Sequence, residues 1–287
     1  MVDDDLAGIQ AGRAGGFGLV VEVNRGGNRA ALEAAGADVV VGDVEQLDLE
    51  ALRAGPWRMI YEGFDPAHES HREALTALGN GYLVTPGAAP ECRADGVHYP
   101  GTYLAGVYNR LVSSVQGREV ETEHLVNAPN WLPLDVGLGA GGSDKQSWWS
   151  SGASTVAEER RELDLRRGLL IRRLVLLDGA GRRLHIRQRR LVSMARPHIA
   201  VLETTLTAEG WSGPVAVRSG LDGGVQNTNV VADAALAHQH WTGVTAARVA
   251  ADTVLLEAET SGSRIRVAVA ARTTVRGAQP SQPILEQ

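Results

Sequence analysis

The sequence predicts a mainly β protein, a large antiparallel β-sandwich (a super-sandwich) that follows a short α/β remnant. Two observations carry this prediction. After about residue 57, apolar and polar residues alternate with a period of two in several runs, which is typical of half-buried antiparallel strands. Before residue 50, short apolar runs alternate with a segment of helical spacing, which indicates parallel strands joined by a helix.

Residues 1–50 are predicted to hold one strand–helix–strand unit of the Rossmann-like kind. A first helix is expected over Asp5–Ala14, because its apolar residues have helical spacing and a glycine pair follows it. Gly18–Val23 and Asp38–Val41 are expected to be buried parallel strands, with a short helix over Arg29–Ala35 between them. One crossover of this kind cannot cover both faces of its sheet, so the segment is interpreted as part of a larger α/β domain.

Residues 51–56 are predicted to be a linker, and residues 57–287 to form the β-sandwich domain, incomplete at its C-terminal end. A short helix is expected over His68–Leu78. Turns rich in Gly, Asp and Ser separate the alternating runs at a spacing typical of a large sandwich. The runs are Leu163–Leu177, Arg182–Leu191, His198–Thr207, Pro214–Ser219, Thr253–Glu259 and Arg264–Ala271.

Composition excludes several classes of function. The net charge of −6 argues against nucleic acid as a partner, since nucleic-acid binding needs a basic surface. No run of 18 apolar residues is present, so we expect no membrane span, and the acidic N-terminus does not resemble a signal peptide. A cytoplasmic location is therefore expected. Cys92 is the single cysteine, which excludes a disulfide within the chain and a zinc site built from several cysteines.

A block dense in Gly, Asn and aromatic residues indicates carbohydrate chemistry. Aromatic rings cover the apolar faces of sugars, Asn side chains reach the hydroxyls, and Gly lets the backbone approach closely. The block contains four characteristic strings: GFDP (Gly63–Pro66), LGNGYLVTPGAAPE (Leu78–Glu91), YPGTYLAGVYNR (Tyr99–Arg110) and LVNAPNWLPL (Leu125–Leu134).

Taken together, these strings resemble the start of glycoside hydrolase family 65, the group of maltose, trehalose and kojibiose phosphorylases. The resemblance continues through LDLRRGLLIRRL (Leu163–Leu174), the stretch Gln188–Gly213 and VRSGLDGGVQN (Val217–Asn227), and it covers about residues 57–275. The family usually reads T-R-G where this chain has Thr85-Pro86-Gly87, so the arginine of that loop is missing here.

The resemblance implies an activity for a longer parent protein. Such enzymes cleave an α-glucosidic disaccharide, such as trehalose, maltose or kojibiose, with inorganic phosphate and release β-glucose 1-phosphate and glucose. One carboxylic acid protonates the leaving sugar oxygen, and in the family this acid lies in a helical barrel after the sandwich. This chain is expected to lack that barrel, to contain no catalytic residue and to need no cofactor of its own. The relatives also suggest a homodimer. Phosphorolysis and hydrolysis both stay open.

Within the Gly-, Asn- and aromatic-rich block, five residues are candidates for contact with the sugar or with the barrel: Asn80, Tyr82, Tyr99, Tyr103 and Asn109. In one interpretation their loops face the barrel and help to shape the sugar pocket. In the other they form a packed domain interface, in which Gly and Asn serve tight turns. The corresponding alternative for the whole chain is a non-catalytic sugar-binding or domain-interface sandwich.

The first segment resembles the C-terminal end of a haloacid-dehalogenase-type phosphatase, closest to β-phosphoglucomutase. The stretches Leu6–Gly8 and Ala11–Gly15 carry this resemblance, and Asp3 and Asp4 stand where the family has an acidic pair that helps to hold Mg²⁺. Here that pair is at most a vestigial magnesium site, because the nucleophilic aspartate and its helpers would precede residue 1. Magnesium is implied only for a complete module of this kind. The two resemblances together imply a fusion of a mutase with a phosphorylase.

Overall fold

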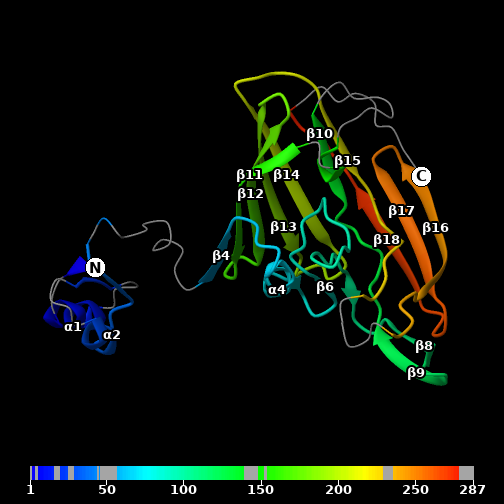
Figure 1. The fold of residues 1–287 in the computed structure, drawn as a ribbon, viewed down its shortest axis with the longest axis horizontal. Coiled ribbons are helices and arrows are strands. Elements are labelled where there is room, and N and C mark those ends of the chain that lie inside the picture. Colours follow the sequence, from blue (N-terminus) through cyan, green and yellow to red (C-terminus); the bar gives the residue numbers. More distant parts are fainter. Residues whose placement is uncertain are drawn as a thin grey trace. The chain divides into compact units, whose positions relative to one another are not determined.

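The computed structural model describes residues 2–3, 6–15, 20–24, 29–43, 45, 57–138, 148–151, 154–228 and 235–277. The chain divides into two compact units, Met1–Arg58 and Met59–Gln287, which Figure 1 shows in blue and in cyan to red. No helix among the described residues is long and apolar enough to cross a membrane.

The first unit is a small parallel sheet with two helices. Its strands β1 (Val2–Asp3), β2 (Val21–Val23) and β3 (Val39–Val41) lie in the order β1-β2-β3, and both pairs are parallel. Helix α1 (Leu6–Ala14) connects β1 to β2, and helix α2 (Arg29–Ala34) connects β2 to β3. Four buried apolar side chains form its core: Ile9, Val20, Leu32 and Val40. The described residues confirm helices at both predicted places and parallel strands at Val21–Val23 and Val39–Val41, while Gly18 and Leu19 of the predicted first strand lie outside the described residues.

The second unit is built on a five-stranded sheet of order β14-β13-β12-β11-β4. Its strands are β4 (Arg58–Glu62), β11 (Ser154–Asp164), β12 (Leu169–Asp178), β13 (Arg183–Val192) and β14 (Ala200–Glu209), and the pairs from β11 to β14 are antiparallel. The predicted run Leu163–Leu177 is not one strand. It joins the end of β11 to β12 across a turn in which Gly168 takes a positive φ of 62°.

Smaller sheets complete this unit, and all their recorded pairs are antiparallel. A three-stranded sheet contains β16 (Trp241–Ala250), β17 (Thr253–Thr260) and β18 (Arg266–Arg272), and a pair contains β10 (Leu134–Leu138) and β15 (Val215–Ser219). Short strands β5 (Leu78–Gly79), β6 (Leu83–Thr85) and β7 (Tyr103–Leu104) form another sheet, and β8 (Tyr108–Val115) and β9 (Arg118–Leu125) form a hairpin. Helix α4 (Glu69–Leu75) and the 3₁₀ turn η3 (Trp149–Ser151) are the helical elements here.

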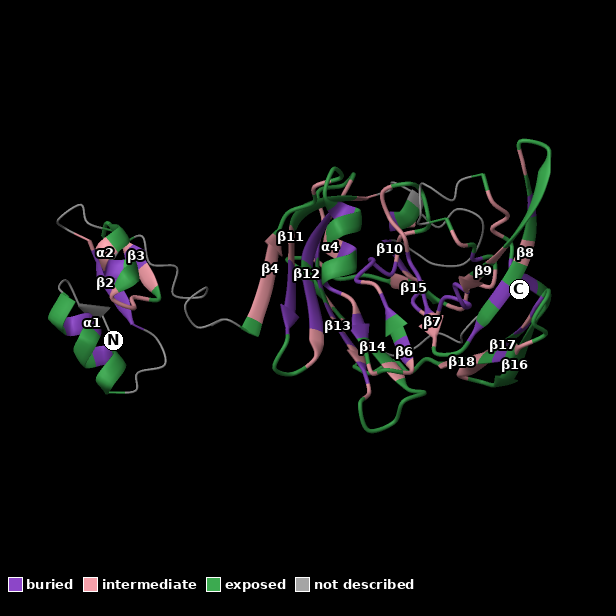
Figure 2. Ribbon diagram, turned by 90° about the horizontal axis from the view of Figure 1, so that it is seen from below, coloured by how far each residue is buried: buried purple, intermediate pink, exposed green. Residues whose placement is uncertain are grey.

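Apolar clusters hold the layers of the second unit together. Val136 and Leu138 of β10 pack against Leu174, Leu176 and Ile186 of the five-stranded sheet, so the β10–β15 pair covers one face of that sheet. A second cluster lies under the three-stranded sheet, and its members are Val107, Val126, Ala128, Val225, Trp241, Leu256, Ala258 and Val267. Figure 2 shows buried residues on β11, β12 and β13 of the five-stranded sheet, whereas β16 is exposed over almost its whole length. The unit is therefore mainly β with antiparallel sheets, as predicted.

Candidate functional site

Charged side chains, rather than apolar ones, fill part of the sheet face near helix α4. Arg161, Arg172 and Arg190 come from the three adjacent strands β11, β12 and β13, and each is at most 8% exposed. Arg161 lies opposite Arg172 in the antiparallel register. We name the group formed by these arginines and the acidic and histidine side chains around them the buried charge cluster: Glu69, Glu73, Glu91, His98, Glu159, Arg161, Arg172 and Arg190.

Arg172 is the centre of this cluster. Its Nη1 donates to both carboxylate oxygens of Glu91, at 2.8 and 2.9 Å, and its Nε donates to Glu159 Oε1 at 2.7 Å. Arg161 pairs with Glu69 of α4. Burial alone would raise the pKa of the Glu159 carboxyl, but the charges of Arg172 and Arg161 beside it bring that pKa below its ordinary value. These pairs join β11 and β12 to α4 and to the loop after β6.

His98 belongs to the same cluster and is held by a carboxylate. Its Nδ1 lies 2.7 Å from Glu73 Oε1, and the backbone N–H of Tyr99 donates to the other oxygen of Glu73 at 2.9 Å. The hydrogen bond to Glu73 raises the pKa of His98, against the effect of burial. Phe64 stacks on the His98 ring with the ring centroids 5.6 Å apart.

Glu69, Glu73 and His98 have the donor types and spacing of a metal site, since their ligand atoms lie within 4.8 Å of one another. Both carboxylates already have hydrogen-bonding partners, however. Arg161 bonds to Glu69, and His98 and the Tyr99 N–H both bond to Glu73. Placing a divalent cation here would bring it next to a guanidinium and an imidazolium. The three side chains therefore fit ion pairs better than a metal centre.

The predicted site residues Asn80 and Tyr82 lie together at the turn between β5 and β6. Asn80 Nδ2 donates to the carbonyls of Ser193 and Pro197 at 2.7 and 3.0 Å, and its Oδ1 accepts from the N–H groups of Tyr82 and Leu83. Tyr82 packs edge-on against the ring of His198, at 4.2 Å between centroids. Asn80 thus ties this turn to the loop that follows β13.

Tyr99 and Tyr103 also lie together, in a second polar cluster. The Tyr103 hydroxyl donates to the Tyr99 hydroxyl at 3.0 Å, and Tyr99 donates to the Gln226 carbonyl at 3.2 Å. Asn127 Nδ2 reaches both the Tyr99 hydroxyl and the Gln226 carbonyl. Burial raises the pKa of both tyrosines, so the hydroxyls stay protonated and serve as neutral hydrogen-bonding groups.

Asn109 is fully buried and lies apart from the other four candidates, where β8 meets the turn between β17 and β18. Its Oδ1 accepts from the N–H groups of Gly262 and Ser263, both at 2.9 Å, and this fixes the amide orientation. Its Nδ2 therefore donates to Nδ1 of His240, at 3.1 Å. Since Nδ1 accepts, His240 is held neutral. Burial, and then the nearby His124 and His238, lower the pKa of His240 to about 4.

The five predicted residues therefore occupy three separate places and do not line one cavity. Sequence reasoning missed the buried charge cluster, although the strings LLIRRLVLL and QRRLV place arginines at positions that alternate with apolar ones. Of the predicted magnesium pair, Asp3 belongs to β1, whereas Asp4 lies outside the described residues. The role of that pair stays a prediction.

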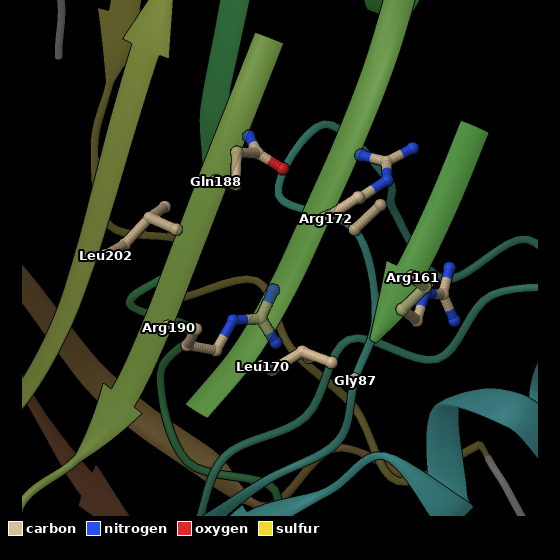
Figure 3. A pocket seen from close by; sticks show the side chains of 8 residues that line it. Gly87, Arg161, Leu170, Arg172, Gln188, Arg190 and Leu202 are labelled. Carbon is tan, nitrogen blue, oxygen red and sulfur yellow. The ribbon is translucent and has the colours of Figure 1, made fainter. Parts of the chain in front are cut away.

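A cavity opens beside the buried charge cluster, between the five-stranded sheet and the loop after β6 (Figure 3). Its residues are Gly87, Ala89, Arg161, Leu170, Arg172, Gln188, Arg190 and Leu202. Its volume of about 10 Å³ is close to that needed by one water molecule. A glucose unit does not fit into it, so it is not a sugar pocket.

Residues 59–287 match one family model, described as "Glycosyl hydrolase family 65, N-terminal domain". The chain is 40% identical over 284 residues to an uncharacterized glycosyl hydrolase of Mycobacterium tuberculosis, which covers 96% of this chain and 21% of the relative. It is 27% identical over 189 residues to a kojibiose phosphorylase of Caldanaerobacter subterraneus, which covers 66% of this chain and 22% of the relative.

Further comparisons agree on the fold. A trehalose 6-phosphate phosphorylase of Lactococcus lactis is 41% identical over 75 residues, 26% of this chain and 10% of the relative. A solved structure from the human microbiome, described as a kojibiose phosphorylase, matches with a TM-score of 0.62 at 19% identity and covers 80% of this chain and 29% of that chain. The chain thus spans about a fifth of the length of the curated relatives that it matches over most of its length.

Proposed function

This chain belongs to glycosyl hydrolase family 65, whose N-terminal domain it contains, and from that premise we propose that it is the non-catalytic β-domain of a longer glycoside phosphorylase. The complete protein would cleave an α-glucosidic disaccharide, such as kojibiose, trehalose or maltose, with inorganic phosphate. Its products would be β-glucose 1-phosphate and glucose. The observation that carries the proposal is the family match over residues 59–287, together with relatives that are phosphorylases.

We place the catalytic acid outside this chain. Among the described residues, the buried carboxylates near the cavity already bond to arginine, histidine or backbone N–H groups. A general acid needs a pocket that seats the glycosidic oxygen, and the cavity beside these carboxylates has room for about one water. The expected position of the acid is a helical barrel in the remainder of the parent protein. A catalytic acid in that barrel also agrees with the alternative interpretation of this chain as a non-catalytic domain-interface sandwich.

For the first unit we propose a haloacid-dehalogenase-like origin, as the C-terminal part of a β-phosphoglucomutase-like module that would hold Mg²⁺ when complete. Its parallel sheet with two connecting helices supports this proposal. The relative from Mycobacterium tuberculosis shares this unit. Because 96% of this chain is matched and the first unit ends at Arg58, most of that unit lies within the match. A mutase in the same protein would consume the β-glucose 1-phosphate that the phosphorylase releases, at a raised local concentration.

The test uses the complete parent protein and this 287-residue chain side by side. Both are incubated with kojibiose, trehalose and maltose, with and without phosphate, and glucose and β-glucose 1-phosphate are measured. We expect the parent to release both products from one disaccharide only when phosphate is present, and this chain to release neither. Turnover by this chain alone would overturn the assignment of catalysis to the rest of the parent. Phosphate-independent release of glucose by the parent would identify a hydrolase instead.

A further inference from the structure

The cavity beside the buried charge cluster has an unusual lining. Three arginines from three adjacent strands and the amide of Gln188 surround it, and Figure 3 shows these side chains around the same space. No carboxylate is among its lining residues. Glu69 and Glu91 bond to Arg161 and Arg172 but do not line the cavity. The charged groups that line the cavity are therefore all cationic.

Three polar atoms of the lining are buried without a hydrogen-bond partner. They are Arg161 Nη1, Arg190 Nε and Gln188 Oε1, and each of the three residues is only 4% exposed. A buried N–H of a charged group without a partner costs more free energy than a neutral one. Because two guanidinium N–H donors beside one small cavity have no acceptor within the described part of the chain, we expect an acceptor from outside the chain to lie between them.

Arg190 strengthens this indication. Its Nη1 and Nη2 donate to the carbonyls of Pro86 and Ala88, at 2.8 and 2.6 Å, and no carboxylate lies within ion-pairing distance of it in the described part of the chain. Burial, and then the positive charges of Arg161 and Arg172, lower the pKa of Arg190 to about 9. At neutral pH it is still a buried cation that has no anionic partner of its own.

We propose that this cavity is a binding site for one small monovalent anion, chloride by its size, held between Arg161 and Arg190. Inorganic phosphate and carboxylate metabolites are too large for a space of about 10 Å³, whereas a halide, as a single atom, is the smallest of the common anions. This site is independent of the proposed phosphorylase activity, because it lies inside the β-domain and takes a ligand of a different size.

The amide of Gln188 adapts to this ligand by a half-turn. The O and N atoms of a glutamine amide are interchangeable in shape, so the turned amide presents its N–H₂ group to the anion. A water molecule would leave the amide as it is, since water can accept from the two guanidinium groups and donate to Gln188 Oε1.

An anion here would also stabilise the loop that departs from the family pattern. Arg190 is the link, because it bonds to Pro86 and Ala88 on one side and has its free Nε on the same guanidinium. An anion beside Arg190 offsets the repulsion that Arg190 feels from Arg161 and Arg172. It therefore favours the charged form of Arg190, which these two carbonyls bind.

The test is thermal unfolding of the chain in sodium chloride, sodium bromide and sodium gluconate at equal ionic strength, with crystals grown in bromide for anomalous scattering. We expect the midpoint to rise by roughly 5 °C at a halide concentration a hundredfold above Kd, relative to gluconate. We also expect one anomalous peak in the cavity. Equal midpoints in the three salts, or density in the cavity without anomalous signal, would overturn the proposal in favour of water.

A variant with its own negative charge in the cavity controls for a general effect of salt on stability. Gln188→Glu places a carboxylate in the cavity, where it can take the place of the anion, so the halide dependence should disappear while the midpoint in gluconate rises. The matched control is Gln226→Glu at an exposed side chain, which should keep the halide dependence of the parent chain. If Gln188→Glu kept its full halide dependence, the anion would be bound elsewhere and the proposal would fail.

Discussion

Two histidines of the same domain, His98 partly buried and His240 fully buried, have pKa values shifted in opposite directions. His98 bonds to the Glu73 carboxylate within the buried charge cluster, which raises its pKa. His240 accepts a hydrogen bond from Asn109 in a neutral surrounding, and its pKa is lowered to about 4. At His98 the bond to Glu73 outweighs burial and raises the pKa, whereas at His240 burial is the largest cause and lowers it. One part of the β-domain is held by charges and the other by neutral hydrogen bonds.

The largest expected effect comes from removing Arg172, the central cation of the buried charge cluster. Arg172→Met leaves the Glu91 carboxylate, 7% exposed, without its cation, and leaves Glu159, 6% exposed, with only its longer contact to Arg161. Removing one partner of a buried pair is expected to lower the free energy of unfolding by about 3–5 kcal/mol. Chemical denaturation measures the change. Arg173→Met is the matched control on the same strand, because Arg173 is 46% exposed, and its loss should stay below about 1 kcal/mol. Equal losses would show that the cluster contributes no more than surface charge.

The next effect separates the two histidines by pH. The pKa of His240 is depressed in the folded state, so folding stability is full above its ordinary value of 6.5 and falls as the pH drops toward about 4. The loss over that range is on the order of 3 kcal/mol by linkage. His240→Gln should remove this part of the acid dependence, whereas His71→Gln, at an exposed position, should leave it. An unchanged acid slope in His240→Gln would show that other groups cause it.

His98 should show the opposite sign. Its pKa is raised by Glu73, so its contribution is fully present below 6.5 and is lost as the pH rises through the folded-state pKa. His98→Gln should therefore make stability less dependent on pH on the alkaline side of 6.5. Denaturation midpoints measured across that range test this. A steeper alkaline loss in the variant would contradict the ion pair with Glu73.

A smaller effect tests the loop that covers the buried charge cluster. A Cβ at Gly87 would lie 1.9 Å from Thr76 Oγ1, so Gly87→Ala must displace that loop or helix α4. We expect a loss of about 1–3 kcal/mol from overpacking. Gly220→Ala is the control, since a Cβ there meets no atom within 4 Å, and it should change stability by less than about 0.5 kcal/mol. A neutral Gly87→Ala would mean that the loop is not closely packed.

The smallest effect tests a neutral hydrogen bond, the one between the hydroxyls of Tyr103 and Tyr99. Tyr103→Phe removes the hydroxyl that donates to Tyr99, and we expect a loss of about 0.5–1.5 kcal/mol. Tyr108→Phe, at an exposed tyrosine, should have almost no effect. The loss from Tyr103→Phe should not change between low and high salt, because no charge is involved. A loss that shrinks in high salt would place Tyr103 in the charged network.

The sequence predicted strands well where one face is buried. Arg264–Ala271 alternates clearly and matches β18 (Arg266–Arg272) closely. Strand β16 was not predicted, because nine of its ten residues are exposed and carry no apolar period. The turn at Gly168 was also missed, since the apolar residues on both sides of it continue one alternating pattern.

The sites were harder to predict than the strands. Asn80 and Asn109 were chosen as residues that could reach sugar hydroxyls, but their amides bond to backbone groups more than 100 residues away. Arg172 and Glu91 are 81 residues apart in the chain, so nothing in local sequence pairs them. An arginine within an apolar strand indicates a buried charge, and only the register of three strands shows that Arg161, Arg172 and Arg190 converge.

The most direct test of the contrast between the two regions is an NMR titration of the histidine rings in the folded chain. His98→Gln and His240→Gln assign the two resonances. We predict that His98 titrates above 6.5 and that His240 stays neutral until the pH falls to about 4. Two midpoints close to 6.5, or a His240 midpoint above that of His98, would contradict the claim that the Glu73 carboxylate raises the pKa of His98 while burial lowers that of His240.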